Sequence, residues 1–286
     1  MIFHQNNTGY KLLKGQRGLT LIELMIAMLL SLIVVFAVSN ILITSNRTAT
    51  LAESVAQSQE TGRYVISYLN RFIMRAGFSP NGEALTPFEV ACVDPNNPDN
   101  TCSLNSDEGT GDRISIVRIL DEDGLSCAGT DVGLVPELEV VDVFWIAIDD
   151  DGNRNLMCLT YDRATQLAAF ATDGAQMQAQ PIAQGVISMH VLYGMANDPT
   201  TVTIGGRNVS RYVNATQVDA DGDGISQESD WLQIYALKLV LLTESFEQIA
   251  GESRESRYIL ADATPYQFND RFSRQIFSTT IARANF

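Results

Sequence analysis

One uncharged stretch dominates the distribution of hydrophobic and polar residues along the chain. Residues 24–45 include no charged residue, no proline and no glycine. A helix rises about 1.5 Å per residue, so this stretch is long enough to cross a hydrocarbon core of about 30 Å. Lys11, Lys14 and Arg17 precede it and an acidic region follows it. By the positive-inside bias, we expect the N-terminus in the cytoplasm and the rest of the chain outside. A secretory signal peptide is the alternative, but its apolar region would be shorter and a small-residue cleavage site would follow it.

Helical periodicity continues beyond this stretch. Apolar and small residues recur at alternating steps of four and three, as one face of a helix requires: Leu51, Val55, Ser58, Gly62, Val65, Leu69, Phe72 and Ala76. No proline occurs from Leu19 until Pro80, and Gly77 is a suitable C-cap. The pattern predicts one helix of about 58 residues, roughly 87 Å long, whose second half packs against the downstream domain. A soluble coiled coil is the alternative for this half, but Ser58 and Gly62 are poor residues for its seam.

The pattern changes from helix to strand after Gly77. Residues 80–111 are rich in Pro, Asn, Asp and Gly and are expected to form a loop, and residues 149–153 have the composition of a hairpin turn. Strand-like segments lie at 113–120, 138–148, 156–161, 186–193 and 231–243, with shorter ones at 257–260 and 275–282. We expect an α+β fold. A long N-terminal α-helix, with a membrane-spanning half and an amphipathic half, packs on a mostly antiparallel β-sheet head.

Glu23 is the one charge near the start of the apolar stretch. An ionisable group inside a membrane costs about 2–3 kcal/mol at the centre and less near an end, so it marks either a partner or a side chain that reaches the headgroups. The sequence from Gly18 to Met25, Gly-Leu-Thr-Leu-Ile-Glu-Leu-Met, resembles the cleavage site of type IV pilins and type II secretion pseudopilins. The resemblance implies that prepilin peptidase cuts between Gly18 and Leu19 and that the new N-terminus is methylated. It also implies that Glu23 lies near the free amine of a neighbouring subunit. Most family members have Phe at the position of Leu19.

Further motifs resemble the PilW type of minor pilin. They lie at residues 60–64 and 68–78, and in a closing strand-like segment at 274–283. The resemblance implies a non-enzymatic minor pilin that helps to initiate type IV pilus assembly and belongs to a tip complex presenting an adhesin. The alternatives are a minor pseudopilin of a type II secretion system and a pilus-borne adhesive or ligand-binding head. The expected division of the chain is a leader at 1–18, a fibre-core or transmembrane helix at 19–45, an amphipathic helix at 46–77 and a β-rich head at 78–286.

The same resemblance implies partners and a location. The expected partners are other minor pilins, the major pilin, prepilin peptidase, the inner-membrane assembly platform and a large tip adhesin. Before assembly the chain is expected to cross the inner membrane once with its head in the periplasm. After assembly it is expected in the surface fibre, at or near the tip.

Charge and composition limit the functions that remain. Removal of residues 1–18 takes away three basic residues and no acidic ones, leaving 16 Lys and Arg against 34 Asp and Glu, a formal charge of −18. Such a surface disfavours nucleic acid and anionic lipid as partners. No G-x-S-x-G or P-loop motif occurs, and His190, the single histidine after residue 18, lies in a strand-like run. An enzyme is therefore not expected.

Four cysteines are expected to form disulfides because the region that holds them is expected outside the cytoplasm. Three pairings are possible. Loop closure favours Cys92–Cys102 and Cys127–Cys158, since each closes a shorter loop than the crossed pairings. Zinc binding is disfavoured because no C-x-x-C motif occurs.

A second candidate site is an acidic loop at residues 219–230. Oxygen donors fall at positions 1, 3, 5, 9 and 12 of a twelve-residue loop, a glycine stands at position 6, and a backbone carbonyl is available at position 7. Hard cations such as Ca²⁺ require several oxygen ligands that converge after a sharp turn. The position-12 residue is Asp in place of the usual Glu, and the flanks resemble strands, so a free-standing calcium loop is expected in place of an EF-hand. The alternative is a solvent-exposed acidic hairpin. The candidate ligands are Asp219, Asp221, Asp223, Ile225, Gln227 and Asp230.

Overall fold

The computed structural model describes most of the chain from residue 18 onwards. The described ranges are 18–80, 85–89, 103–106, 109–120, 123–130, 137–164, 179–195, 209–219, 222–224, 226–249 and 253–283. The chain divides into two compact units, residues 1–49 and 50–286. Helix α1 (Leu21–Arg75) begins in the first unit and ends in the second.

In the first unit, α1 is apolar and exposed throughout. Its large apolar side chains between Leu21 and Ile43 are 46–79% exposed. By length and composition alone, this helix is long and apolar enough to cross a membrane, with a mean hydropathy of 2.8 in its most apolar window. The hydroxyl groups of Ser31 and Thr44 donate to the carbonyls of Met28 and Asn40. These hydroxyls are thus satisfied within the helix, as a lipid environment requires.

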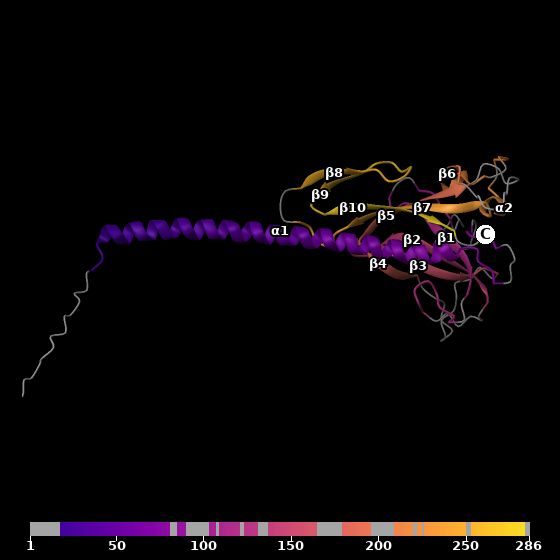
Figure 1. Ribbon diagram of the computed structural model, residues 1–286, viewed down its shortest axis with the longest axis horizontal. Coiled ribbons are helices and arrows are strands. Elements are labelled where there is room, and N and C mark those ends of the chain that lie inside the picture. The colour runs from indigo at the N-terminus through magenta and orange to yellow at the C-terminus, as the bar shows by residue number, and fades with distance from the viewer. Residues whose placement is uncertain are drawn as a thin grey trace, which may run out of the picture. The chain divides into compact units, whose positions relative to one another are not determined.

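The second unit contains two antiparallel four-stranded sheets (Figure 1). The first has the order β1-β2-β3-β4 and the second the order β10-β7-β5-β6, and β8 and β9 form a separate hairpin. Two short helices, η1 and α2, precede β7. The bounds are β1 Ile114–Ile119, β2 Glu139–Ile148, β3 Arg154–Asp162, β4 Gln180–Gln184, β5 Val186–Met195, β6 Arg211–Val213, η1 Ala215–Gln217, α2 Glu228–Trp231, β7 Ile234–Glu244, β8 Arg254–Tyr258, β9 Tyr266–Asp270 and β10 Arg274–Ala282.

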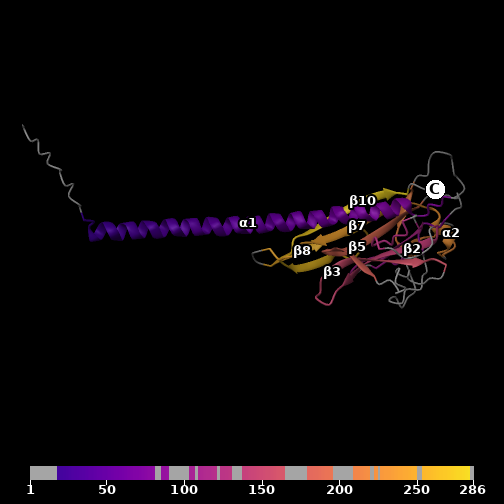
Figure 2. The same cartoon turned by 90° about the horizontal axis from the view of Figure 1, so that it is seen from below.

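The main core lies between α1 and both sheets (Figure 2). Val65, Leu69 and Ile73 of α1 are fully buried, together with apolar residues of β2, β5 and β7. Small residues bring the helix close to the second sheet. The Ser58 hydroxyl lies 2.7 Å from that of Thr243 on β7, and the Phe277 ring of β10 packs on Gly62.

The sequence predicted much of this architecture. The α+β class, the long helix and all five long strands are confirmed, and Gly77 follows the helix with a φ of +69°. The predicted turn at 149–153 is also confirmed, because the Asp149 carboxylate accepts the N–H groups of Asp151 and Asn153 at 3.1 and 2.7 Å.

Three predictions about the sheets were wrong. One sheet was expected, but the head has two sheets and a hairpin. The strand expected from Trp231 begins at Ile234, because residues 228–231 form α2 instead. Strands β4, β6 and β9 were missed; they have three to five residues each, too few for a clear alternation of polar and apolar positions. On the predicted helical stripe, Leu51 is 43% exposed, and burial begins at Ser54.

Candidate functional site

The predicted cleavage site lies just outside the helix. Gly18, Leu19 and Thr20 are exposed and precede the first helical residue, Leu21. A Cβ added to Gly18 would meet no atom within 4 Å. Packing against the described residues therefore does not explain a glycine at this position. An exposed, non-helical backbone is also the form that a peptidase requires of its substrate.

Glu23 occupies the first turn of α1. The Thr20 hydroxyl accepts the Glu23 N–H at 3.3 Å, and the Thr20 carbonyl accepts the N–H of Leu24 at 3.2 Å, so Thr20 caps the helix. A carboxylate in the first turn is favoured by the helix dipole. The Glu23 side chain has no partner among the described residues, which leaves its carboxylate open to a group from another molecule.

A disulfide and a buried polar network support the α1 side of the head. Cys127 is bonded to Cys158, the pairing that loop closure favours. The Tyr68 hydroxyl of α1 donates to the Cys127 carbonyl, and the Cys127 N–H donates to the Thr160 hydroxyl at 2.9 Å. Thr160 in turn donates to the carboxylate of fully buried Asp142 at 2.6 Å.

Arg118 completes this network. Its guanidinium pairs with Asp142 and donates to the Leu125 carbonyl at 2.9 Å, which ties β1 and β2 to the disulfide loop. The other predicted pair, Cys92–Cys102, lies outside the described residues.

Part of the predicted calcium loop is described, and it forms a tight turn. The Asp219 carboxylate accepts the N–H groups of Gly222 and Gly224 at 2.7 and 3.0 Å. Gly224, at the sixth loop position, has a φ of +82°, which favours glycine. Asp223 accepts a hydrogen bond from the Gln227 side chain at 2.8 Å. Among the described residues no group of three or more Asp, Glu, His or Cys could hold a metal ion. Asp221 and Ile225 lie outside those residues.

The end of this loop continues into α2. Asp230 is 1% exposed, and its carboxylate accepts the Gln227 N–H at 2.7 Å, so it caps the helix. The next residue, Trp231, is fully buried, and its indole N–H donates to Ser226 at 2.9 Å. The loop is thus fixed to the core at its C-terminal end.

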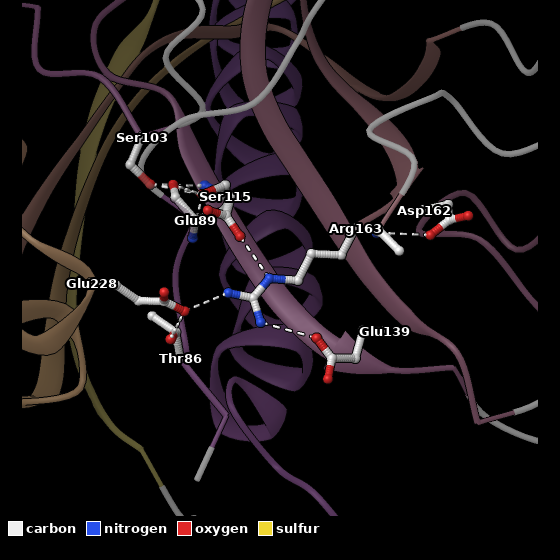
Figure 3. Close-up of polar contacts among 9 residues, drawn as sticks. Thr86, Glu89, Ser103, Ser115, Glu139, Asp162, Arg163 and Glu228 are labelled. Carbon is white, nitrogen blue, oxygen red and sulfur yellow. Dashed lines mark hydrogen bonds and ion pairs between the residues drawn. The ribbon is translucent and has the colours of Figure 1, made fainter.

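Arg163 joins three acidic side chains from distant parts of the head (Figure 3). Its guanidinium nitrogens lie 2.8, 2.9 and 2.7 Å from carboxylate oxygens of Glu89, Glu139 and Glu228. Burial disfavours the charged guanidinium, but these hydrogen bonds and charges outweigh it and raise the pKa of Arg163. A hydrogen bond from Thr86, followed by one from Arg163, lowers the pKa of Glu228. Because Glu228 begins α2, this network connects the acidic loop to the first sheet.

No pattern in the sequence predicts this network. Arg163 lies 74, 24 and 65 residues from its three partners, and no local pattern joins them. Arg118 has an alternating strand pattern around it, which identifies its strand but not its charge partner.

His190 belongs to a buried polar cluster and is not accessible from the surface. Its Nδ1 lies 3.5 Å from an Asp112 oxygen, and its Nε2 lies 3.1 Å from Ser188 Oγ and 2.8 Å from the Tyr266 hydroxyl. Ser188, His190 and Asp112 are 0, 1 and 3% exposed. The contacts run from serine to histidine to aspartate, as in a hydrolytic triad, but Ser188 is fully buried and so is not accessible to a substrate in this structure. The cluster instead links β5 to the β8–β9 hairpin.

Comparisons with known proteins give one family match to the N-terminal segment and one to the head. Residues 143–285 match the family model described as Type IV Pilus-assembly protein W, and residues 13–39 match that of the prokaryotic N-terminal methylation motif. No curated protein and no solved structure gives a match. The methylation motif and the apolar helix together support membrane anchoring. Because the first match spans half of the 286 residues, the resemblance is confirmed, and the chain belongs to the type IV pilus-assembly protein W family.

Proposed function

We propose that this chain is a minor pilin that helps to initiate type IV pilus assembly and forms part of the tip complex that presents an adhesin. The observation that carries the proposal is the coincidence of three features at one helix end. They are an exposed Gly18–Leu19 bond, a methylation motif, and a Glu23 side chain that has no partner among the described residues of an exposed apolar helix. Other minor pilins, the major pilin, the assembly platform and a large adhesin are the proposed partners. The match to the W family favours a pilus over a type II secretion system.

Glu23 is proposed to set the position of the subunit in the fibre. Cleavage after Gly18 by prepilin peptidase would leave a free α-ammonium at Leu19, and Glu23 would then be the fifth residue. A buried carboxylate and a buried ammonium each lose hydration, and pairing between neighbouring subunits offsets that loss. Among the described residues of the chain, the carboxylate has the helix dipole but no cation as a partner. The pairing is therefore formed only on assembly.

A deletion strain complemented with variants tests both parts of the proposal. Loss of pili with an unchanged pool of major pilin is expected on deletion, because priming fails. Glu23→Ala is expected to be inserted in the membrane and cleaved but to be missing from sheared fibres, whereas Glu53→Ala, at an exposed position of the same helix, is expected to assemble normally. Normal incorporation of Glu23→Ala would refute the role of Glu23, and normal piliation of the deletion strain would refute priming.

We further propose that the acidic loop binds one structural Ca²⁺. The described residues fit a calcium loop in two respects: Gly224 makes the sharp turn, and Asp219 closes it. Asp219, Asp223 and Gln227 would supply oxygen ligands, with Asp221, the Ile225 carbonyl and Asp230 completing the set. Bound Ca²⁺ would supply positive charge that holds these oxygens together in a strongly acidic head.

Calorimetry and thermal melting of the full chain in detergent test the calcium proposal. Heat of binding and a higher melting temperature are expected in millimolar Ca²⁺, and Asp219→Asn with Asp223→Asn should abolish both. Asp149→Asn with Asp151→Asn is the matched control, because these acids lie in another exposed turn. An equal melting temperature with Ca²⁺ and with a chelator would rule out the site.

A further inference from the structure

A small cavity opens between the last turns of α1 and the loop that carries Cys127. Its volume is about 270 Å³, and it lies entirely within the second unit. One wall is the helix, and the other is the loop at residues 125–129. The side chains that define it are Tyr68, Arg71, Phe72, Arg75, Arg118 and Leu125. None of the described residues that line it is acidic, in a chain of formal charge −15.

Buried contacts fix the shape of this cavity. The Tyr68 hydroxyl donates to the Cys127 carbonyl, and Arg118 donates to the Leu125 carbonyl at 2.9 Å. The Cys127–Cys158 disulfide anchors the same loop to β3. Because side chains and a covalent bond hold both walls, a ligand would meet a preformed pocket.

The positive charge at the mouth of the cavity comes from two arginines. Arg71 and Arg75 are exposed and lie one helical turn apart; Arg75 also interacts within the chain, and Arg118 is paired with Asp142. The Arg71 guanidinium lies 5.2 Å from the centre of the Tyr68 ring and has no carboxylate partner among the described residues. In the loop, the N–H groups of Ser126 and Gly129 donate to carbonyls of the loop itself. Recognition of a ligand therefore falls to the arginine side chains and the rings.

We infer that this pocket receives an acidic side chain of a neighbouring pilin subunit. A guanidinium binds a carboxylate through two parallel hydrogen bonds, and aromatic rings pack well against the aliphatic stem of Glu or Asp. The volume is at the lower end of the roughly 300–1,000 Å³ of pockets for free small ligands and is large enough for a single anchoring side chain. An acidic surface such as this chain itself carries is the complementary partner. The inference rests on the proposed assembly of this chain with other pilins.

Site-specific photocrosslinking in producing cells tests the pocket. The full chain carries p-benzoylphenylalanine in place of Leu125, which lines the cavity and is 40% exposed. We expect a crosslink to a pilin subunit, identified by mass spectrometry at a peptide with Asp or Glu. Arg71→Glu with Arg75→Glu should reduce that product at least tenfold, and Arg63→Glu, an exposed arginine of the same helix outside the pocket, should not. Formation of the disulfide on non-reducing gels shows that each variant has folded.

A charge exchange gives the decisive result. Replacing the crosslinked acid of the partner by arginine should restore the product in the Arg71→Glu and Arg75→Glu background. Three results would each overturn the inference. They are an unchanged yield of the crosslink in the Arg71→Glu and Arg75→Glu background, a product with a protein other than a pilin, and no product from chains that are present in sheared fibres. If the wild-type chain is missing from fibres, the proposed function itself fails, so the two failures are distinguishable.

Discussion

Gly62 allows α1 to approach the second sheet, and a single methyl group at this position tests that contact. A Cβ on Gly62 would lie 2.3, 2.4 and 2.6 Å from three carbons of the Phe277 ring, far inside van der Waals contact. Overpacking of this kind costs about 1–3 kcal/mol. Alanine is about 1 kcal/mol better than glycine in a helix interior, which offsets part of that cost. We expect Gly62→Ala to lower the free energy of unfolding by about 1 kcal/mol and the melting temperature by about 2–4 °C.

The same change should have the opposite sign when the ring is absent. In a Phe277→Ala background the added methyl group meets no ring, so only the gain in helix propensity remains and Gly62→Ala should stabilise by about 1 kcal/mol. The expected coupling energy is therefore about 2 kcal/mol. Urea unfolding of the full chain in detergent, followed by fluorescence of Trp145 and Trp231, measures all four variants. Equal effects of Gly62→Ala in the two backgrounds would refute the close-contact explanation.

Three further predictions concern the network beside α1. Replacing both Cys127 and Cys158 by Ala opens a loop with a sequence separation of 31 and should cost about 3–4 kcal/mol, measured by urea midpoints under oxidising conditions. Burial, and then the charge of Asp142, raises the pKa of Tyr68 to about 12. The neutral phenol is thus favoured in the folded state, so its contribution to stability is complete below pH 10 and is lost as the pH rises through 12. The melting temperature of Tyr68→Phe should therefore fall less steeply between pH 10 and pH 12 than that of the wild type. Arg118→Met leaves Asp142 buried without its cation and should cost about 3–5 kcal/mol, most of which Asp142→Leu should restore in the double variant.

The parts of the structure that the sequence predicted are those encoded by neighbouring residues. The helix and the long strands have periods of 3.6 and 2 that extend over at least one full element. The motif from Gly18 to Met25 is contiguous, so Gly18 and Glu23 could be picked out by their resemblance to prepilin cleavage sites. Gly62 is an intermediate case. Its place on the helical stripe was visible, but the reason for a glycine became clear only when Phe277, more than 200 residues later, was found against it.

The parts that the sequence could not predict depend on contacts between distant segments. The division of the strands into two sheets follows from which strands pair, and β10 pairs with β7 across the whole β8–β9 hairpin. The partners of Arg163 and Arg118 come from separate strands, a loop and a short helix, and the sequence alone left every acidic residue of the chain an equal candidate. Residue type therefore indicated an acidic surface, but only the fold shows where arginines gather on it.

The exposed helix also explains why Glu23 is expected to act in the fibre and not in the membrane. Eighteen large apolar side chains between Leu19 and Ile43 are 46–79% exposed. Complete burial of one such side chain is worth about 1.5–3 kcal/mol, so transfer of the segment out of water is favoured by tens of kcal/mol. A carboxylate near the end of the segment costs at most about 3 kcal/mol, which cannot prevent insertion. In lipid, replacing Glu23 by Ala removes a small cost, whereas in the proposed fibre core it would leave the α-ammonium of a neighbour buried without its counter-charge. Membrane insertion and fibre incorporation should therefore respond to Glu23→Ala in opposite directions.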